Sequence, residues 1–235
     1  MVETEEVIEL IRALREKCPW DKKRKLRDLV GLFLEESYEL LDAVDSGDKT
    51  MITEEVGDLL FLGLMATMIA EEEFEIDPDN LQARLIAKYK ARHPHVFGDL
   101  KVKDDEDVLK QWEKGKENPF DGIPRSLPAL VHAKLIQQRA ARYGFDWESV
   151  TGPLDKVKEE VDEILKSRKE SQEIEFGDLF FSLVNVARFL KIDAEIALKR
   201  TCEKFQQRFK TVLEKCGPDA DLKEMDRIWN ELKDE

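Results

Sequence analysis

Residues 35–61 read EESYELLDAVDSGDKTMITEEVGDLLF, and this stretch places acids at a regular spacing in two apolar segments. Glu36 and Glu39 stand three residues apart, and Glu55 and Asp58 repeat that spacing after a turn. Side chains three positions apart on an α-helix project from nearly the same face. Two such helices packed antiparallel would direct four carboxylates at one another, and four acids in one place require a cation.

The second half of the chain carries the same arrangement. Its matching acids are Glu160, Glu163, Glu175 and Asp178. The segment 175–181 (EFGDLFF) echoes the segment 55–61 (EVGDLLF). Two basic pairs follow at equal spacing, Lys88 with Arg92 and Lys204 with Arg208. Matched landmarks in the same order indicate an internal duplication.

Apolar residues recur at helical spacing almost throughout, whereas alternating, strand-like segments are nearly absent. We expect a first helix that ends at Cys18-Pro19 and a second that ends in the turn 45–48. A third helix is expected over about 53–72, capped by Thr53, and a fourth over about 78–92. The sequence therefore predicts an all-α fold, built as a tandem repeat of helical bundles.

Proline, glycine and acidic residues interrupt the helical pattern between the repeats. We expect an N-terminal domain over 1–98, a linker over 99–128 and a C-terminal domain over 129–235, with one short helix around 108–116 in the linker. Each domain offers only a few amphipathic helices around an acid-lined seam. We therefore expect the core to be completed by a second copy of the chain, or by the two repeats packing against each other within one chain.

The positions of the acids on their helices distinguish them from ordinary solvated residues. Glu36 falls in the middle of an apolar stripe, Glu39 falls at its edge, and Asp58 is embedded in a helix that is apolar nearly all round. A buried, unpaired carboxylate is costly or takes up a proton, and a coordinated metal ion removes that penalty. In the second repeat Glu160 lies at the margin of the stripe and Glu163 points away from it. This indicates a more open site, or a bundle that a second chain covers.

Oxygen ligands without histidine suit Mg²⁺ or Mn²⁺, whereas a di-iron bundle would carry histidines where Asp58 and Asp178 stand. Magnesium held by carboxylates keeps positions for water and substrate phosphates, so phosphoanhydride hydrolysis is the expected chemistry. The basic pairs would then hold phosphate oxygens that the metal leaves uncovered. A solvated surface is the ordinary alternative for such pairs. Glycines at positions 57 and 177 would permit close approach of helices or serve packing alone.

The composition limits the partners of the chain. A formal net charge of −14 over 235 residues disfavours binding to nucleic-acid polymers and anionic membranes. The longest near-apolar run, residues 59–70, is too short to cross a bilayer, and the acidic N-terminus is unlike a secretory leader. Three widely spaced cysteines lack the pattern of a zinc site or disulfide framework. A cytoplasmic protein is expected.

Several further motifs, together with the repeated acids, resemble those of the MazG nucleoside triphosphate pyrophosphohydrolases. They are CPWD at 18–21, RHPHVF at 92–97, IPRSLPAL at 123–130 and GFDW at 144–147. The resemblance covers almost the whole chain. It implies two tandem MazG domains, a homodimer, and Mg²⁺-dependent hydrolysis of NTP and dNTP to the monophosphate and diphosphate. Broad nucleotide specificity and a house-cleaning role are also implied.

The resemblance assigns roles to individual residues. The implied C-terminal metal ligands are Glu160, Glu163, Glu175 and Asp178. The implied nucleotide-binding residues are Lys156, Lys204, Arg208 and the aromatic Trp229. In some two-domain relatives only the C-terminal domain is active, but the first repeat here keeps Glu36, Glu39, Glu55 and Asp58 with Lys88 and Arg92. Glu159 and Glu35, adjacent to the ligands, are candidates for the base that takes the proton of the attacking water.

One departure from the family pattern concerns the stretch between Glu163 and Glu175. It is shorter than the matching stretch of the first repeat and shorter than usual in the family, and Ser171 stands where relatives can carry a basic residue. Two other functions are compatible with the sequence. One is an all-α pyrophosphatase restricted to a single nucleotide, of the dUTP or dCTP type. The other is a non-catalytic helical regulator whose acids hold a metal, a nucleotide or a basic partner.

Overall fold

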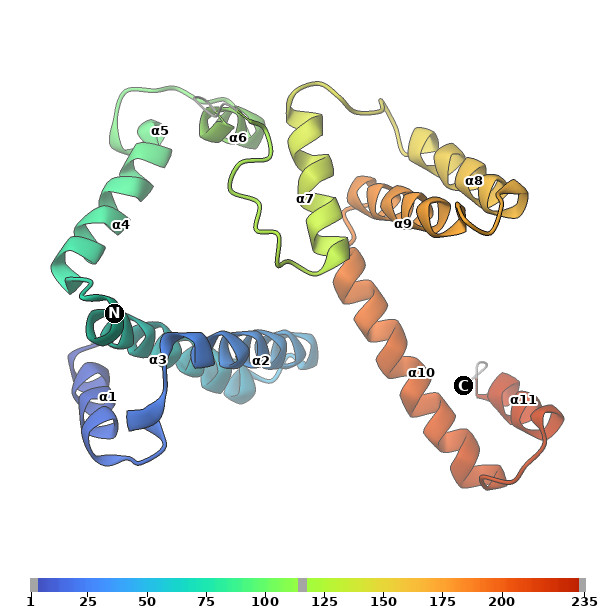
Figure 1. The fold of residues 1–235 in the computed structure, drawn as a ribbon, viewed down its shortest axis with the longest axis horizontal. Helices are drawn as coiled ribbons and strands as arrows, with labels where there is room; N and C mark the ends of the chain where they lie inside the picture. Colours follow the sequence, from blue (N-terminus) through green and yellow to red (C-terminus); the bar gives the residue numbers. More distant parts are fainter. Residues whose placement is uncertain (1–3, 114–117, 233–235) are drawn as a thin grey trace. The chain divides into compact units, whose positions relative to one another are not determined.

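The computed structural model describes residues 4–113 and 118–232, which form helices joined by turns and loops, with no β-strand among them (Figure 1). The predicted all-α fold class is confirmed. Two compact units make up the chain, residues 1–102 and residues 103–235. Their boundary falls in the segment 99–128. Within the described ranges, no helix has the length and apolar character needed to cross a membrane.

The first unit is built around a pair of long helices that lie side by side (Figure 1). Its helices are α1 (Glu5–Lys17), a short 3₁₀ turn (Asp21–Lys23), α2 (Leu26–Ser46), α3 (Lys49–Phe74), α4 (Pro78–Arg92) and α5 (Pro94–Phe97). The first helix stops before Cys18-Pro19, as predicted, because proline cannot continue the hydrogen-bond ladder. Gly47 ends α2 in the left-handed conformation at φ 70°. A tight turn therefore reverses the chain and makes α2 and α3 antiparallel.

The start of α3 differs from the prediction. Asp48 is the N-cap, since its carboxylate accepts the N–H groups of Thr50 (2.8 Å) and Met51 (3.4 Å), and the helix begins at Lys49. Thr53, the predicted cap, lies one turn inside α3 and donates its hydroxyl to the Lys49 carbonyl (2.7 Å). Asp48 directly follows the turn, so its carboxylate lies beside the free N–H groups of the first helical turn. Its negative charge also suits the helix N-terminus.

The core of the first unit lies at the end of the α2–α3 pair that is remote from the turn. Its fully buried residues are Ile11, Leu29, Leu62, Met65 and Ile69. Polar contacts fix the same end of α3: Glu73 accepts the N–H of Leu26 (2.9 Å) and pairs with Lys25 (3.0 Å). These two contacts hold the pKa of Glu73 below its usual value. The acid-bearing half of the pair, nearer the turn, is left outside this core.

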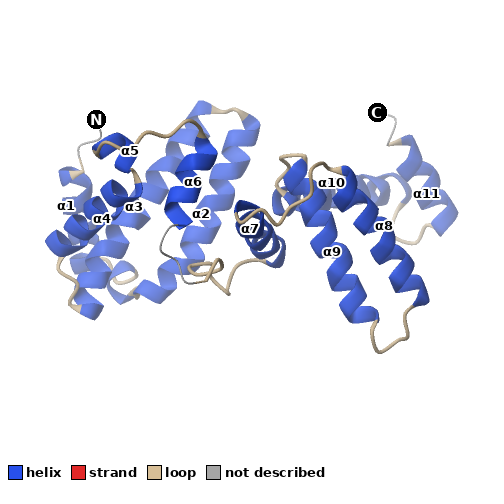
Figure 2. Cartoon of the chain, turned by 90° about the horizontal axis from the view of Figure 1, so that it is seen from above, coloured by secondary structure: helices blue, strands red, loops and turns tan. Residues whose placement is uncertain are grey.

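The second unit contains another antiparallel helix pair, α8 and α9, visible from above in Figure 2. Its helices are α6 (Asp105–Glu113), α7 (Ala129–Arg142), α8 (Thr151–Lys166), α9 (Gln172–Phe189), α10 (Ala194–Cys216) and α11 (Leu222–Glu231). α7 packs on α9, and α11 packs on α10. α6 covers residues 108–113 of the predicted linker helix, and the predicted residues 114–116 lie outside the described ones.

Neither glycine that precedes a site aspartate marks a close approach of helices. A Cβ atom built at Gly57 or at Gly177 would meet no neighbouring side chain or helix within 4 Å. Both positions are exposed in the single chain. The two glycines therefore leave open space beside the acids.

Asp193 joins two elements of the second unit, and its removal should destabilise the protein. Its carboxylate accepts the N–H of Ile196 (3.2 Å), which caps α10, and binds Lys134 of α7 (2.7 Å). Burial alone would raise the pKa of Asp193, but the bonds from Lys134 and Ile196 outweigh it and lower this pKa. We expect Asp193→Ala to lower the free energy of unfolding by about 1–2 kcal/mol, measured by urea denaturation at pH 7.

The direction of the pKa shift determines how the stability contributed by Asp193 depends on pH. A carboxylate whose pKa is lowered by folding stabilises the protein above its unfolded pKa, about 3.9, and this contribution is lost as the pH falls through the lower folded value. The difference between wild type and Asp193→Ala should therefore shrink below about pH 4. Asp193→Asn keeps a capping oxygen and should lose less stability. Equal unfolding free energies for wild type and Asp193→Ala at pH 7 would contradict the assignment.

Candidate active site

The first acidic cluster spans the α2–α3 pair. Glu36 of α2 and Glu55 and Asp58 of α3 each present a carboxylate oxygen, and these three oxygens lie within 4.8 Å of one another. Burial, followed by the negative charges of Asp58, Glu39 and Glu55, raises the pKa of Glu36. Burial and the charges of Glu39 and Asp58 raise the pKa of Glu55 as well. Like charges held this close favour a bound cation.

One member of the first predicted ligand set, Asp58, lies differently from the prediction, and another, Glu39, lies outside the group of three. Asp58 was expected to be embedded in apolar surroundings, but its side chain is exposed. The buried core residues of α3, from Leu62 to Ile69, lie in its second half. The turn of helix that carries Asp58 therefore keeps an open face. Glu39 is also exposed and does not belong to the group of three.

The second acidic cluster spans the α8–α9 pair. Glu160 and Glu163 of α8 and Glu175 of α9 bring one carboxylate oxygen each within 4.8 Å of the others. Burial, and then the charge of Glu160, raises the pKa of Glu163. Asp178, the fourth predicted ligand, is exposed on α9 and does not belong to this group. Each repeat therefore gathers three of its four predicted acids.

Glu160 is much more buried than its helix pattern predicts. Its side chain keeps only 2% of its accessible surface, although the α8 stripe placed it at the margin. α9 packs against α8 and brings Glu175 close to it, and Nζ of Lys156, one turn earlier, contacts its Oε1. Glu163, predicted to point away from the stripe, is exposed and still reaches the cluster.

Lys156 bridges two acids at the edge of this cluster. Its Nζ lies 2.6 Å from Oε1 of Glu160 and 2.8 Å from Oε1 of Glu159. These two contacts raise the pKa of Lys156, which stays fully charged. The other oxygen of Glu160, Oε2, is buried and has no hydrogen-bond partner.

A basic and aromatic pocket lies on α10 and α11. The guanidinium carbon of Arg208 stands 5.1 Å from the centre of the Trp229 ring, and the Phe205 ring lies tilted against the same ring with its centre 5.0 Å away. A cavity of about 190 Å³ opens beside this group and is lined by Lys204, Gln207, Arg208, Thr211 and Leu232. Trp229 is half-buried. In the first unit, Lys88 and Arg92 lie exposed on α4.

Sequence reasoning missed four residues of this pocket: Gln207, Thr211, Leu232 and Phe205. The signal was present, because Lys204, Gln207, Arg208 and Thr211 recur at spacings of three and four residues and share one face of a helix. Phe205 follows Lys204 directly, and its ring contacts the Trp229 ring.

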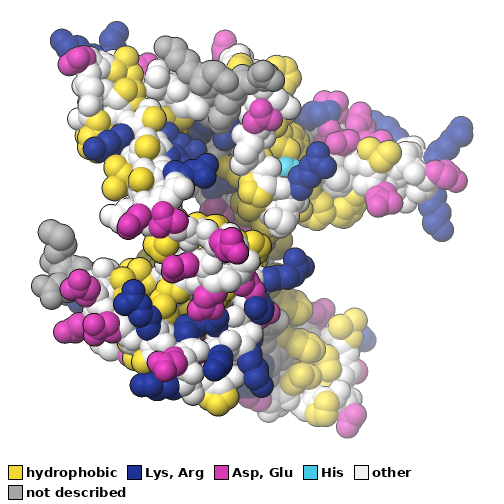
Figure 3. All heavy atoms as spheres, turned by 60° about the vertical axis from the view of Figure 1, so that its left-hand side comes forward, with side chains coloured by type: hydrophobic (Ala, Val, Ile, Leu, Met, Phe, Trp, Pro, Cys, Tyr) yellow, Lys and Arg dark blue, Asp and Glu magenta, His cyan; other side chains and the backbone are white. Residues whose placement is uncertain are grey.

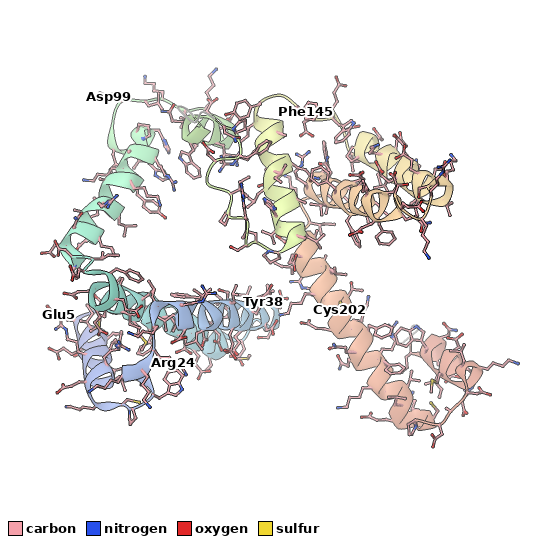
Figure 4. The ribbon with its side chains drawn as sticks, viewed as in Figure 1. Glu5, Arg24, Tyr38, Asp99, Phe145 and Cys202 are labelled. Atoms are coloured by element: carbon pink, nitrogen blue, oxygen red, sulfur yellow. The ribbon has the colours of Figure 1, made fainter. Side chains whose placement is uncertain are left out.

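The donor atoms of both acidic clusters fit a hard divalent cation. A buried carboxylate oxygen without a hydrogen-bond partner is present in each, Oε2 of Glu55 and Oε2 of Glu160. Such oxygens are costly to bury unless something binds them. The ligand atoms in each cluster are all carboxylate oxygens, which Mg²⁺ and Mn²⁺ prefer. Among the described residues, the three cysteines are free thiols, and Cys202 lies exposed on α10 (Figure 4).

Comparison with known proteins places the chain in a family. The family model of the MazG nucleotide pyrophosphohydrolase domain matches twice, at residues 24–97 and 150–213. The chain is 38% identical over 250 residues to a nucleoside triphosphate pyrophosphohydrolase of Escherichia coli strain K12, covering 97% of this chain and 94% of that protein. It is also 38% identical over 244 residues to the nucleoside triphosphate pyrophosphohydrolase/pyrophosphatase MazG of Thermotoga maritima, covering 97% and 95%.

A solved structure is also similar to part of the chain. The crystal structure of a MazG-related protein from Thermotoga maritima aligns with a TM-score of 0.44 and 27% identity, over 48% of this chain and 99% of that one. Both family matches contain one acidic cluster with its helix pair. The chain therefore belongs to the MazG nucleotide pyrophosphohydrolase family and carries the MazG domain twice.

Proposed function

We propose that the chain hydrolyses nucleoside triphosphates, both ribo and deoxy, to the monophosphate and pyrophosphate in a Mg²⁺-dependent reaction of broad specificity. The observation that carries this proposal is the cluster of Glu160, Glu163 and Glu175, with its unpartnered buried oxygen. It occurs in a chain 38% identical, over nearly its whole length, to proteins named nucleoside triphosphate pyrophosphohydrolases. Removal of damaged or surplus nucleotides is the house-cleaning role that such an activity would serve.

In this proposal the acids of each α-helix pair hold the cations. Glu160, Glu163 and Glu175 are the ligands in the second unit, and Asp178, three residues after Glu175 on α9, is the fourth. The first-unit ligands are Glu36, Glu55 and Asp58, with Glu39 beside them. Bound Mg²⁺ supplies a Lewis acid that offsets charge on the phosphate oxygens and on the leaving pyrophosphate.

The remaining residues bind the substrate and move a proton. A triphosphate meets a chain of net charge −14, so local cations must attract it, and Lys204 and Arg208 do so in the α10–α11 pocket. Trp229 stacks on the base, a contact that any base can make, and this supports broad specificity. Glu159 is exposed next to the cluster, where it can accept the proton of the attacking water, and Glu35 is its counterpart in the first repeat.

The experiment that tests this function uses the full chain with a mixture of ribonucleotides and deoxyribonucleotides and with Mg²⁺. Products are resolved by ion-exchange chromatography, with and without the chelator EDTA. We expect several triphosphates to yield monophosphate and pyrophosphate in equal amounts, and EDTA to abolish the reaction. Release of orthophosphate would contradict the proposed bond cleavage. Consumption of one nucleotide alone would favour a dUTP- or dCTP-type specialist, and the absence of product would favour a non-catalytic regulator.

We further propose that the working protein is a homodimer in which a second copy covers the apolar surface of α9. Figure 3 shows apolar side chains grouped on the surface of the chain among charged ones. A cavity of about 480 Å³ between α7, α9 and α10 is lined almost wholly by apolar groups, among them Phe180, Phe181 and Leu198. These three side chains are 41–50% exposed, which is costly for large apolar residues in water.

The homodimer predicts a defined effect of charge in this apolar surface. Phe181→Asp should convert the dimer to monomer at micromolar concentration, because burying an unpaired carboxylate in the interface costs several kcal/mol. Sedimentation velocity of wild type and variant over a range of concentrations measures this. Phe145→Asp is the matched control, since Phe145 lies 84% exposed in the loop between α7 and α8 (Figure 4). A wild type that sediments as a monomer at all concentrations would contradict the proposal.

A further inference from the structure

Lys156 contacts Glu160, the buried acid of the second cluster, and a divalent ion bound there would compete with its ammonium group for the same carboxylate. Its Nζ lies 2.6 Å from Oε1 of Glu160, and the Glu160 side chain is only 2% exposed. The ammonium therefore supplies the charge that compensates a buried carboxylate in the metal-free protein. The ammonium group is not itself sealed in, because 36% of the Lys156 side chain is exposed and its Nζ also contacts the exposed Glu159 at 2.8 Å.

The first repeat lacks this internal cation. The residue four positions before Glu36, which corresponds to Lys156 before Glu160, is Leu32. Leu32 is partly buried and packs against the core of the first unit. The electrostatic neighbours of Glu36 are the acids Asp58, Glu39 and Glu55. The two acidic clusters therefore share a ligand pattern but differ in one built-in positive charge.

We propose that Lys156 is an exchangeable cation: it neutralises Glu160 before the divalent ion binds, and it gives up that carboxylate when the ion arrives. This inference rests on the proposed function, since it takes the second cluster as the metal site. The released ammonium is then free for an oxygen of the triphosphate. Lys156 acts in this step as a positioning residue that couples metal binding to nucleotide binding.

Three physical arguments support the exchange. A lysine ammonium and a divalent ion on one carboxylate repel each other, so the two states exclude one another in part. A charged Glu160 is costly to bury without a cation in either state. The flexible four-carbon stem of lysine allows the ammonium, which already contacts the exposed Glu159, to move from Glu160 to a phosphate.

The exchange has two measurable consequences. Removing the ammonium should strengthen binding of the divalent ion, because the ion no longer displaces a competitor. Removing it should also weaken the coupling between metal and nucleotide, because the released group is missing. By reciprocity, the factor by which the metal improves nucleotide binding equals the factor by which the nucleotide improves metal binding. A residue that only contacts phosphate would leave metal affinity in the absence of nucleotide unchanged.

The test uses full-length protein with Glu36→Gln and Asp58→Asn, which removes the first cluster as a competing site. Titration calorimetry with Mn²⁺ at pH 8, without nucleotide, compares this background with the same background carrying Lys156→Met. We expect the dissociation constant for Mn²⁺ to fall roughly tenfold, the effect of about 1.4 kcal/mol. Lys158→Met is the matched control on the same helix, since Lys158 pairs with the exposed Asp155 (2.7 Å), and it should change nothing. Lys156→Arg restores the charge and should restore the weaker affinity.

A second titration measures the coupling. The affinity for a non-hydrolysable triphosphate analogue is determined with and without Mn²⁺, and the ratio of the two should be at least about fivefold smaller in Lys156→Met than in the background. Unchanged or weaker Mn²⁺ binding in Lys156→Met would overturn the exchange while leaving the metal site intact. Failure of the background protein to bind Mn²⁺ would overturn both the exchange and the proposed function of the second cluster.

Discussion

Glu160→Gln is expected to reduce the rate of nucleotide hydrolysis by roughly 100- to 1,000-fold, the effect of removing one essential charged group from a preorganised site. Glutamine keeps the size of the buried side chain and removes the negative charge that the divalent ion needs. Lys156 would lose the negative charge of its 2.6 Å partner but keep that of Glu159. Helicity should not change, since no backbone hydrogen bond of α8 depends on this carboxylate. Pyrophosphate release and far-ultraviolet circular dichroism measure the two expectations.

Two variants make this result specific. Asp162→Asn, on the exposed side of α8 where Asp162 pairs with Lys166 (3.6 Å), should keep full activity. Glu36→Gln makes the equivalent change in the first repeat and shows how much of the turnover that repeat supplies. If Glu160→Gln kept most of the activity and Glu36→Gln lost it, the first unit would be the working site. Full activity in both single variants and in the double variant would remove the acids from the mechanism.

Local sequence signals predicted the fold well where the structure obeys local rules. The fourth helix was expected over about 78–92, and α4 spans Pro78–Arg92 because Pro78 suits a first helical position and Asp77 caps it (3.1 Å to the N–H of Asp79). The end of α1 before Pro19 follows from the same kind of signal. The duplication was also readable, since the family domain matches both halves of the chain.

The predictions that differ from the structure concern what covers a helix rather than the helix itself. A helical wheel gives the face that Glu160 occupies on α8, but its burial depends on the helix that packs against α8, which is α9. Asp58 shows the opposite case, because the apolar residues that follow it on α3 predict burial, whereas its side chain is exposed. The periodicity of one helix contains no information on its neighbours. The cap of α3 was misplaced for a simpler reason, since two capping residues compete within six positions and the one next to the turn prevails.

Arg208→Ala is expected to lower kcat/KM for a nucleoside triphosphate roughly 10- to 150-fold, which corresponds to the loss of charged hydrogen bonds worth about 1.5–3 kcal/mol. Arg208 lines the α10–α11 cavity with Lys204, and its guanidinium stands 5.1 Å from the Trp229 ring. In the proposed function one residue would therefore meet the phosphates and also order the ring that stacks on the base. Steady-state kinetics at fixed Mg²⁺ over a range of nucleotide concentrations measures the loss.

Further substitutions in and near the pocket distinguish the effect of the Arg208 charge from the effect of its side-chain shape. Arg208→Lys keeps the positive charge but loses the planar fork and its stacking, so an intermediate loss is expected. Lys210→Ala is the control, because Lys210 is exposed on the same helix and only approaches Glu214 (4.0 Å).

Trp229→Phe should keep most base stacking, whereas Trp229→Ala should cost about 1–3 kcal/mol for every base alike. Unchanged kcat/KM in both Arg208→Ala and Trp229→Ala would show that the nucleotide does not use this pocket. A loss confined to one base would show that the pocket reads base identity, contrary to broad specificity.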